Sequence, residues 1–208
     1  MSGAVMNKNI LAALLLLTAC DSAPSQPPLS SAPLAGATIG GDFSLTDQDG
    51  KKRTYAEFDG QYRIVYFGYT NCPDICTPDV QNLMAGLKAF DEASPELASK
   101  IQPIFITVDP QRDTPAVLKQ FASAFHPRLI GLTGNEVEIA AAAKKFAVQH
   151  FRVEGSQPDA YLMGHSQLPY LMAPDGKPLA ILPADLPKTD ANEGAPDLVT
   201  AELAKWVR

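Results

Sequence analysis

The sequence has no excess of basic residues, and this limits the partners it can have. Lys and Arg number 17 against 23 Asp and Glu, which gives a formal net charge of −6. Binding to nucleic acid needs clustered Lys and Arg that neutralise phosphates, and the sequence shows no such cluster. We therefore expect no nucleic acid partner. The sequence also lacks an internal repeat, and 208 residues suit a single domain with a full core.

Long apolar runs are also scarce. The run at 10–17 is too short for a transmembrane helix and follows a weakly basic start, which is typical of a secretory signal. It leads into Leu17-Thr18-Ala19-Cys20, which resembles the bacterial lipobox, in which the cysteine becomes the lipidated N-terminus. We predict a lipoprotein signal peptide over 1–19 and lipidation of Cys20. The alternative is an ordinary signal peptide with an incidental cysteine, and both versions predict export.

The next segment has too little apolar content to form a core. Residues 20–38 are rich in Pro, Ser and Ala, and we predict a lipid-attached, extended linker there. The folded domain is expected to cover 39–208. A lipid on Cys20 would tether this domain to a membrane on its periplasmic side, and Asp21 favours the inner membrane.

Cysteines number only three, so the folded domain has only Cys72 and Cys76. In an oxidising compartment such a pair serves as a disulfide, a redox couple or a metal site. A disulfide across so short a loop would constrain the unfolded chain little, which makes a structural disulfide the weakest of the three. The pair follows an apolar run and precedes a helix, as a thioredoxin-type dithiol does, but its spacing is CxxxC. That spacing sets the sulfurs about one helical turn apart, which suits a soft metal ion as well as a redox pair.

Hydrophobic patterning and turn residues predict an α/β protein. A β-hairpin is expected over 39–55 around Asp49-Gly50, and a second one joins 161–173 to 179–182. Further strands are predicted at 64–67, 101–108, 129–132 and 148–153, and helices at 78–93, 115–125, 136–146 and 197–207. Thr114 and Asn135 are the expected caps of the second and third helices. This order predicts a thioredoxin-like fold, with a central mixed sheet flanked by helices and an N-terminal β-hairpin.

Four motifs then carry a family resemblance. They are Phe67-Gly68-Tyr69-Thr70-Asn71-Cys72-Pro73-Asp74-Ile75-Cys76, the run 108–115 (VDPQRDTP), the run 125–134 (FHPRLIGLTG), and His165-Ser166 with Tyr170-Leu171 and a Pro-Asp-Gly turn. Together they resemble the Sco/SenC family of copper chaperones, from about residue 39 to the C-terminus. The resemblance implies copper binding through Cys72, Cys76 and His165. It also implies delivery of copper to the CuA site of cytochrome c oxidase, with its copper-binding subunit or another copper chaperone as the partner.

The chemistry of these side chains agrees with that implication. Two thiolates and one imidazole suit Cu(I), and with a further ligand they can hold Cu(II). A nearby helix N-terminus lowers thiol pKa values and so favours the thiolates that a metal needs. A structural zinc site would want a fourth protein ligand, for which no strong candidate is evident.

A thiol-disulfide oxidoreductase is the alternative function. In that role Cys72 would attack a disulfide and Cys76 would resolve it, which would keep the cysteines of a recipient oxidase reduced. If the protein is a chaperone, we expect no enzymatic activity. If it is the alternative, we expect thiol-disulfide reductase activity. The two can be combined, because only the reduced dithiol can load copper.

Other candidate side chains carry less weight. His126 and His150 are expected to be structural, and Met163 is expected in the core, although its thioether would face the same way as His165 on a strand. Asp74 and Asp109 could tune the site electrostatically or cap turns.

Two positions depart from the family pattern. The residue before the metal-binding histidine is often acidic in the family and is Gly164 here, which removes a contact that could orient the imidazole. Thr77 follows Cys76, where the family usually has proline, which predicts a slightly shifted entry into the helix.

Overall fold

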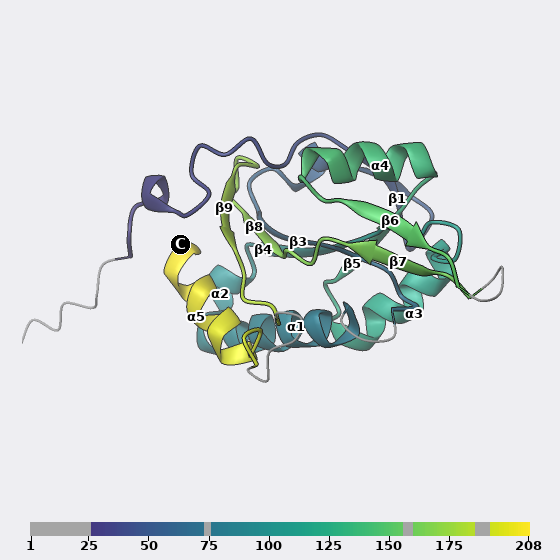
Figure 1. The fold of residues 1–208 in the computed structure, drawn as a ribbon. Helices are drawn as coiled ribbons and strands as arrows, with labels where there is room; N and C mark the ends of the chain where they lie inside the picture. The colour runs from purple at the N-terminus through teal and green to yellow at the C-terminus, as the bar shows by residue number, and fades with distance from the viewer. Residues whose placement is uncertain (1–25, 73–75, 156–159, 186–191) are drawn as a thin grey trace, which may run out of the picture.

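A computed structural model describes residues 26–72, 76–155, 160–185 and 192–208, with the backbone alone at Cys76. A seven-stranded mixed sheet with strand order β2-β1-β5-β4-β3-β8-β9 forms its centre (Figure 1). Its strands are β1 (Ser44–Asp47), β2 (Lys52–Thr54), β3 (Tyr62–Gly68), β4 (Ile101–Thr107), β5 (Ile130–Thr133), β8 (Tyr170–Met172) and β9 (Pro178–Ile181). A separate ribbon pairs β6 (His150–Val153) with β7 (Leu162–His165).

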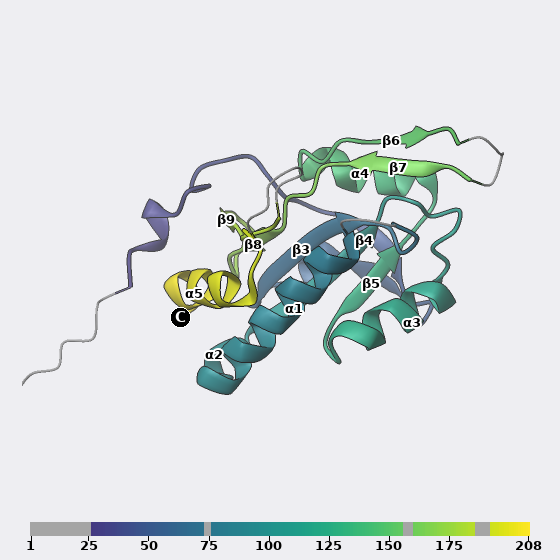
Figure 2. The ribbon, with the colours of Figure 1, turned by 60° about the horizontal axis from the view of Figure 1, so that its bottom comes forward.

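Helices cover both faces of the central sheet. They are α1 (Cys76–Ala93), α2 (Pro95–Ala98), α3 (Pro115–Phe125), α4 (Glu136–Lys145) and α5 (Pro196–Trp206), with short 3-10 turns at Leu29–Ser31 and Tyr55–Phe58. Helices α1, α3 and α5 lie on one face, and α4 lies on the other, beside the β6–β7 ribbon (Figures 1 and 2). The fold is thioredoxin-like, as predicted. None of the helices within the described ranges is long and apolar enough to cross a membrane.

The central strands form because their sequences are apolar and rich in β-branched and aromatic residues. Every residue of β3 is buried, and β3 pairs in parallel with β4, which pairs in parallel with β5. Strands buried on both faces are expected to be continuously apolar. The predicted strands at 64–67, 101–108 and 129–132 are confirmed, with small differences at their ends.

Local turn and cap signals were also reliable. The predicted N-terminal hairpin is β1–β2, and Gly50 supplies the positive φ of +78° that its turn needs. The Thr114 hydroxyl accepts from the Val117 N–H at the start of α3, and Asn135 forms a capping box with Glu138 at the start of α4. Helix α1 begins at Cys76, earlier than the predicted residue 78.

The predicted strand over 161–173 is wrong as a single element. It divides into β7, which pairs with β6, and β8, which pairs with β3 and β9. The ladder of β6 and β7 ends where Ser166 donates its N–H to Gln149, and Pro169, just before β8, has no N–H to continue a ladder. The hairpin around 174–176 is confirmed, but only β8 and β9 form it.

Residues 26–38, the described part of the predicted linker, have contacts with the folded domain. Ala32 is buried, Leu34 packs against the core, and the Leu34 N–H donates to Leu179 of β9. The Gln26 amide also donates to the carbonyls of Ala204 and Val207. The few apolar side chains in this segment are enough to hold it along the domain. The predictions for residues 1–25, which include the signal peptide and Cys20, lie outside the described residues.

Candidate metal centre

Cys72 lies in the loop that follows β3. Its side chain is partly buried and packs against the hydrophobic core. Cys76 is the first residue of α1, so the chain leads from the central strand β3 to a helix N-terminus. The side chain of Cys76 and residue Asp74 lie outside the described part of the chain, and so does the predicted Cys72–Cys76 dithiol. The placement agrees with the strand–loop–helix context predicted for the pair.

Asp113 holds the loop that carries Cys72. This fully buried carboxylate accepts from the Thr70 N–H at 3.0 Å, the Thr70 hydroxyl at 2.6 Å and the Thr107 hydroxyl at 2.6 Å. Burial raises the pKa of Asp113, and these donated hydrogen bonds oppose that rise. Because Thr70 is two residues before Cys72, Asp113 sets where the cysteine lies relative to the end of β4. Asp113 belongs to the motif at 108–115, which by itself gives no sign of this role.

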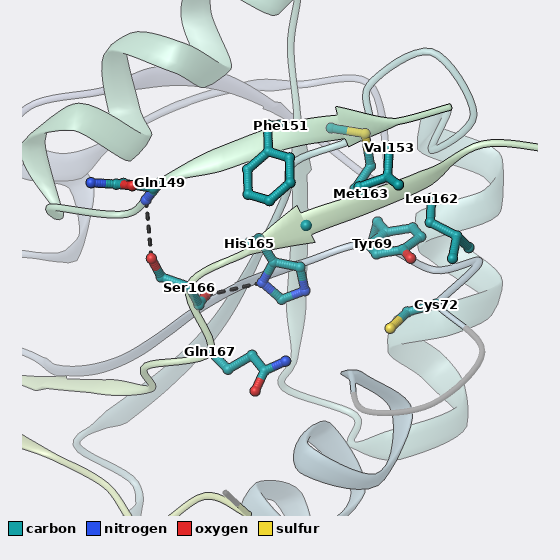
Figure 3. A pocket seen from close by; sticks show the side chains of 11 residues that line it. Tyr69, Cys72, Gln149, Phe151, Val153, Leu162, Met163, His165, Ser166 and Gln167 are labelled. Atoms are coloured by element: carbon teal, nitrogen blue, oxygen red, sulfur yellow. Dashed lines mark hydrogen bonds between the residues drawn. The ribbon is translucent and has the colours of Figure 1, made fainter. Parts of the chain in front are cut away.

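His165 is the last residue of β7, and its ring is oriented by its surroundings. Its Nδ1 lies 3.0 Å from the Ser166 carbonyl. A carbonyl can only accept, so Nδ1 carries the proton and the lone pair of the neutral ring is on Nε2. The ring packs edge-on against Tyr66 and Tyr69, with centroid distances of 6.4 and 6.0 Å. In Figure 3 the second ring nitrogen lies on the side of the ring that faces Cys72.

Cys72 and His165 line the same cavity, which has a volume of about 480 Å³. Both side chains point into it in Figure 3. The cavity runs along β7 and is otherwise lined by Tyr69, Gln149, Phe151, Val153, Leu162, Met163, Gly164, Ser166 and Gln167. Across the described ranges no group of three or more His, Cys, Asp and Glu side chains is arranged to hold a metal ion. Two of the three predicted ligands are thus brought together, and the third, Cys76, is the first residue of α1.

A buried acid adjoins this site from α1. Asp79 accepts from the Tyr66 hydroxyl at 2.8 Å, and the same tyrosine packs against His165. Burial raises the pKa of Asp79, and the nearby His165 partly opposes this rise. The role of Asp79 is not visible in the sequence, because its partner Tyr66 lies on a different element. An acid three residues after a cysteine has no signal of its own.

Asp109 belongs to a cluster that connects the β4–α3 loop to the β6–β7 ribbon. It is buried, accepts from the Tyr161 hydroxyl at 2.8 Å and pairs with the Arg112 guanidinium. Arg112 also donates to the Tyr161 carbonyl at 3.0 Å and stacks over the Tyr161 and Tyr69 rings. Asp109 therefore holds a structural cluster at the edge of the site. Its predicted electrostatic effect on the metal stays a prediction.

The other histidines occupy different places. His126 is buried at the C-terminal end of α3, where its Nδ1 accepts from the Arg128 N–H at 3.2 Å, which agrees with the predicted structural role. His150 lies directly opposite His165 in the β6–β7 ladder. Burial lowers the pKa of His150, and the charge of His165 lowers it further.

Gly164, the departure from the family pattern, has a local explanation. A Cβ on Gly164 would come within 2.5 Å of the Phe151 ring, which lies across it from β6. The missing side chain is therefore replaced by an aromatic ring that closes over the glycine. Thr77, the other departure, lies in the first turn of α1, one residue after the helix begins.

Placing aspartate at 164 tests this explanation. Gly164→Asp is expected to displace the Phe151 ring and to lower the free energy of unfolding by about 1–3 kcal/mol, because the new side chain overpacks the site. Gly164→Asp combined with Phe151→Ala is expected to recover most of that loss. Urea denaturation measures both values. Equal destabilisation by the single and the double substitution would contradict the explanation.

Comparison with known proteins identifies the family of this chain. A sequence model described as SCO1/SenC matches residues 31–200. The chain belongs to the SCO1/SenC family. Among curated SCO1/SenC relatives, the mitochondrial SCO2 homolog of Bos taurus is 42% identical over 144 residues, which are 69% of this chain and 53% of that protein. The SCO2-like protein of Rickettsia felis is 42% identical over 140 residues, which are 67% of this chain and 66% of that protein. The chain thus spans between about half and two thirds of the length of these curated relatives.

Two solved SCO1/SenC structures share the fold of this chain. Bradyrhizobium japonicum ScoI, with copper bound, aligns with a TM-score of 0.68 and 37% identity, over 81% of this chain and 99% of that chain. Yeast Sco1, also with copper bound, aligns with a TM-score of 0.64 and 36% identity, over 82% of this chain and 91% of that chain. These likenesses confirm both the predicted family and the predicted fold.

Proposed function

We propose that this protein is a copper chaperone that delivers copper to the CuA site of cytochrome c oxidase. The observation that carries the proposal is the shared cavity of Cys72 and His165, with Cys76 at the adjoining helix start. Membership of the SCO1/SenC family and the copper-bound structures of two relatives support it. The recipient would be the copper-binding subunit of the oxidase or another copper chaperone.

The donor set fits copper as a cargo. Thiolates from Cys72 and Cys76 and the Nε2 of His165 would make a soft set of low coordination number, which favours Cu(I) and accepts Cu(II) with a further ligand. The helix N-terminus at Cys76 favours the thiolate forms. The bond from Nδ1 of His165 to Ser166 fixes the tautomer that presents Nε2 to the cavity.

The state of the dithiol would control loading. Oxidation converts the two thiolates to a disulfide and passes two electrons to an oxidising disulfide partner, which removes both sulfur ligands. Reduction by a dithiol partner restores them. Loading is then confined to the reduced protein.

Export and membrane attachment complete the proposal. The signal-like segment and Cys20 support a lipid anchor in the inner membrane that faces the periplasm. The Arg208 side chain donates to the Pro27 carbonyl, so the chain that leads back to the anchor leaves beside the end of α5. The β6–β7 ribbon projects on the other side of the domain (Figures 1 and 2). Such a tether would leave the copper cavity accessible to a partner.

Copper binding to the reduced full chain tests the proposal. We expect one tightly bound Cu(I), measured by competition with a chromophoric chelator without oxygen, and loss of that tight binding in Cys72→Ser, Cys76→Ser and His165→Ala. His126→Gln is the matched control, because this histidine lies outside the cavity. Circular dichroism checks that each variant is folded. Unchanged tight binding in any of the three ligand variants would remove that residue from the site.

The thiol-disulfide oxidoreductase remains the second candidate, because a thioredoxin-like fold places Cys72 partly exposed before a helix. His165→Ala separates the two functions. A chaperone loses copper binding and keeps any disulfide reduction that the cysteines perform. A variant that binds copper normally but no longer reduces a disulfide substrate would show that His165 serves the dithiol and not the metal.

A further inference from the structure

The inward face of the β6–β7 ribbon carries more copper-compatible donors than the proposed site uses. In the antiparallel register, His150 lies opposite His165 and Arg152 lies opposite Met163. Directly opposed residues lie on the same face of a ribbon, and alternate residues along each strand share that face. His150, Met163 and His165 therefore share one face. The two imidazoles are direct neighbours, and Met163 is a diagonal neighbour of His150, within reach of a long side chain.

Met163 connects two cavities. It lines the cavity of Cys72 and His165, and it also lines a second cavity of about 250 Å³ together with His150. A single flexible thioether therefore forms part of the wall of both. The second cavity also contains the carboxylates of Asp109 and Glu136 and the guanidinium of Arg152, which is paired with Glu154. Asp109 is in turn paired with Arg112, whereas Glu136 accepts, among the described residues, only from the neutral Gln111 amide and leaves the second cavity with a negative charge.

The hydrogen bonding of His150 differs from that of His126. It is partly buried, yet its ring has no hydrogen bond within the ranges that the structure describes. His126, by contrast, receives a backbone N–H at a helix end. His150 shares the second cavity with Met163 and lies opposite His165 in the ladder, so three side chains that can bind a soft cation are neighbours.

We propose that His150, Met163 and His165 form a second, weaker Cu(I) position on the inward face of the ribbon. Two imidazoles and a thioether are neutral donors that favour Cu(I) but hold it less tightly than thiolates do. Cargo would pass between this position and Cys72 by ligand exchange, with His165 common to both sets. No electron transfer is involved, because copper stays Cu(I) throughout. The proposal extends the proposed function, on which it rests for the role of His165.

Silver(I), a redox-inert substitute for Cu(I), tests the second position in the full chain with all three cysteines replaced by serine. Methionine methyl resonances are followed by NMR during the titration. We expect the Met163 methyl to shift and the buried methyl of Met172 to stay unchanged. His150→Gln in the same background should abolish the shift, and His126→Gln should leave it intact. Met163→Leu keeps the packing volume and should lower the affinity for silver, which calorimetric titration measures because this variant has no Met163 methyl.

The result separates this proposal from the proposed function, since the protein used has no cysteine. A Met163 shift that depends on His150 supports the second position, whatever the wild-type chain does with copper. No Met163 shift, or a shift that survives His150→Gln in a variant with an unchanged circular dichroism spectrum, overturns it. Failure of the thiolate site would instead appear as loss of tight Cu(I) binding by the wild-type chain.

Discussion

Arg112→Ala is expected to lower the free energy of unfolding by about 3 kcal/mol, because it leaves the buried Asp109 carboxylate without its cation. The substitution also removes the hydrogen bond to the Tyr161 carbonyl and the stacking on the Tyr161 and Tyr69 rings. These contacts join the β4–α3 loop, the Cys72 loop and the start of the ribbon. Urea denaturation measures the loss of stability, and hydrogen exchange should show faster opening of β6 and β7.

Arg152→Ala is the matched control. Arg152 stacks on the same Tyr161 ring with its Cζ 3.8 Å from the centroid, but its ion pair is with Glu154, whose side chain is 71% exposed. Exposed pairs contribute about 0–1 kcal/mol, so loss of the pair with Glu154 should cost less than loss of the pair with the buried Asp109. The loss of stability in Arg112→Lys should lie between those of the two alanine variants. An ammonium can pair with Asp109 but cannot also reproduce the planar guanidinium contacts with Tyr161. Equal effects of Arg112→Ala and Arg152→Ala would contradict a special role for Arg112.

Asp113→Ala is expected to be at least as damaging, with a loss of about 3 kcal/mol or more in the free energy of unfolding. Three donors, two from the half-buried Thr70 and one from the fully buried Thr107, lose their only described acceptor. Because Thr70 is close to Cys72, affinity for Cu(I) should fall as well. Denaturation in urea and chelator competition give the two values.

Asp113→Asn distinguishes packing from hydrogen bonding. The amide keeps the volume but has one acceptor oxygen and adds donors, so it should be destabilising and still weaken copper binding. Asp91→Asn is the control, because its ion pair with Arg128 is partly exposed and should contribute about 0–1 kcal/mol. Wild-type stability and copper affinity in Asp113→Ala would show that the loop is held by other contacts.

Most of the fold could be predicted from local signals. The continuous apolar run of β3, the Thr114 cap and the turn at Gly50 each act over a few residues, so their sequence signatures are reliable. The division of 161–173 could not be predicted, because its two halves pair with different strands far along the chain. The contacts of Ala32 and Leu34 with the domain could not be predicted, because composition does not reveal where a few apolar side chains pack.

The candidate site was only partly predictable for the same reason. Cys72 and His165 could be found through motif resemblance, and the structure places them in one cavity. The residues that hold these two side chains could not be found in this way. Asp113 accepts from Thr70, 43 positions earlier, and Tyr161 donates to Asp109, 52 positions earlier. Such long-range hydrogen bonds leave no periodic pattern in a single sequence. The placement of His150 opposite His165 likewise depends on a strand register that the sequence does not specify.

The two halves of the copper cavity are supported by different parts of the molecule. Cys72 is held through Asp113 to the central sheet, whereas His165 belongs to a two-stranded ribbon outside that sheet. A cargo ion that joins the two would cross-link ribbon and sheet, and would stabilise the ribbon by linkage. Three apolar side chains of the ribbon line this cavity and are also exposed, Phe151 by 62%, Val153 by 44% and Leu162 by 45%. The copper-loaded and copper-free proteins would then differ in the stiffness of this apolar surface. A recipient that binds this surface could distinguish the two forms.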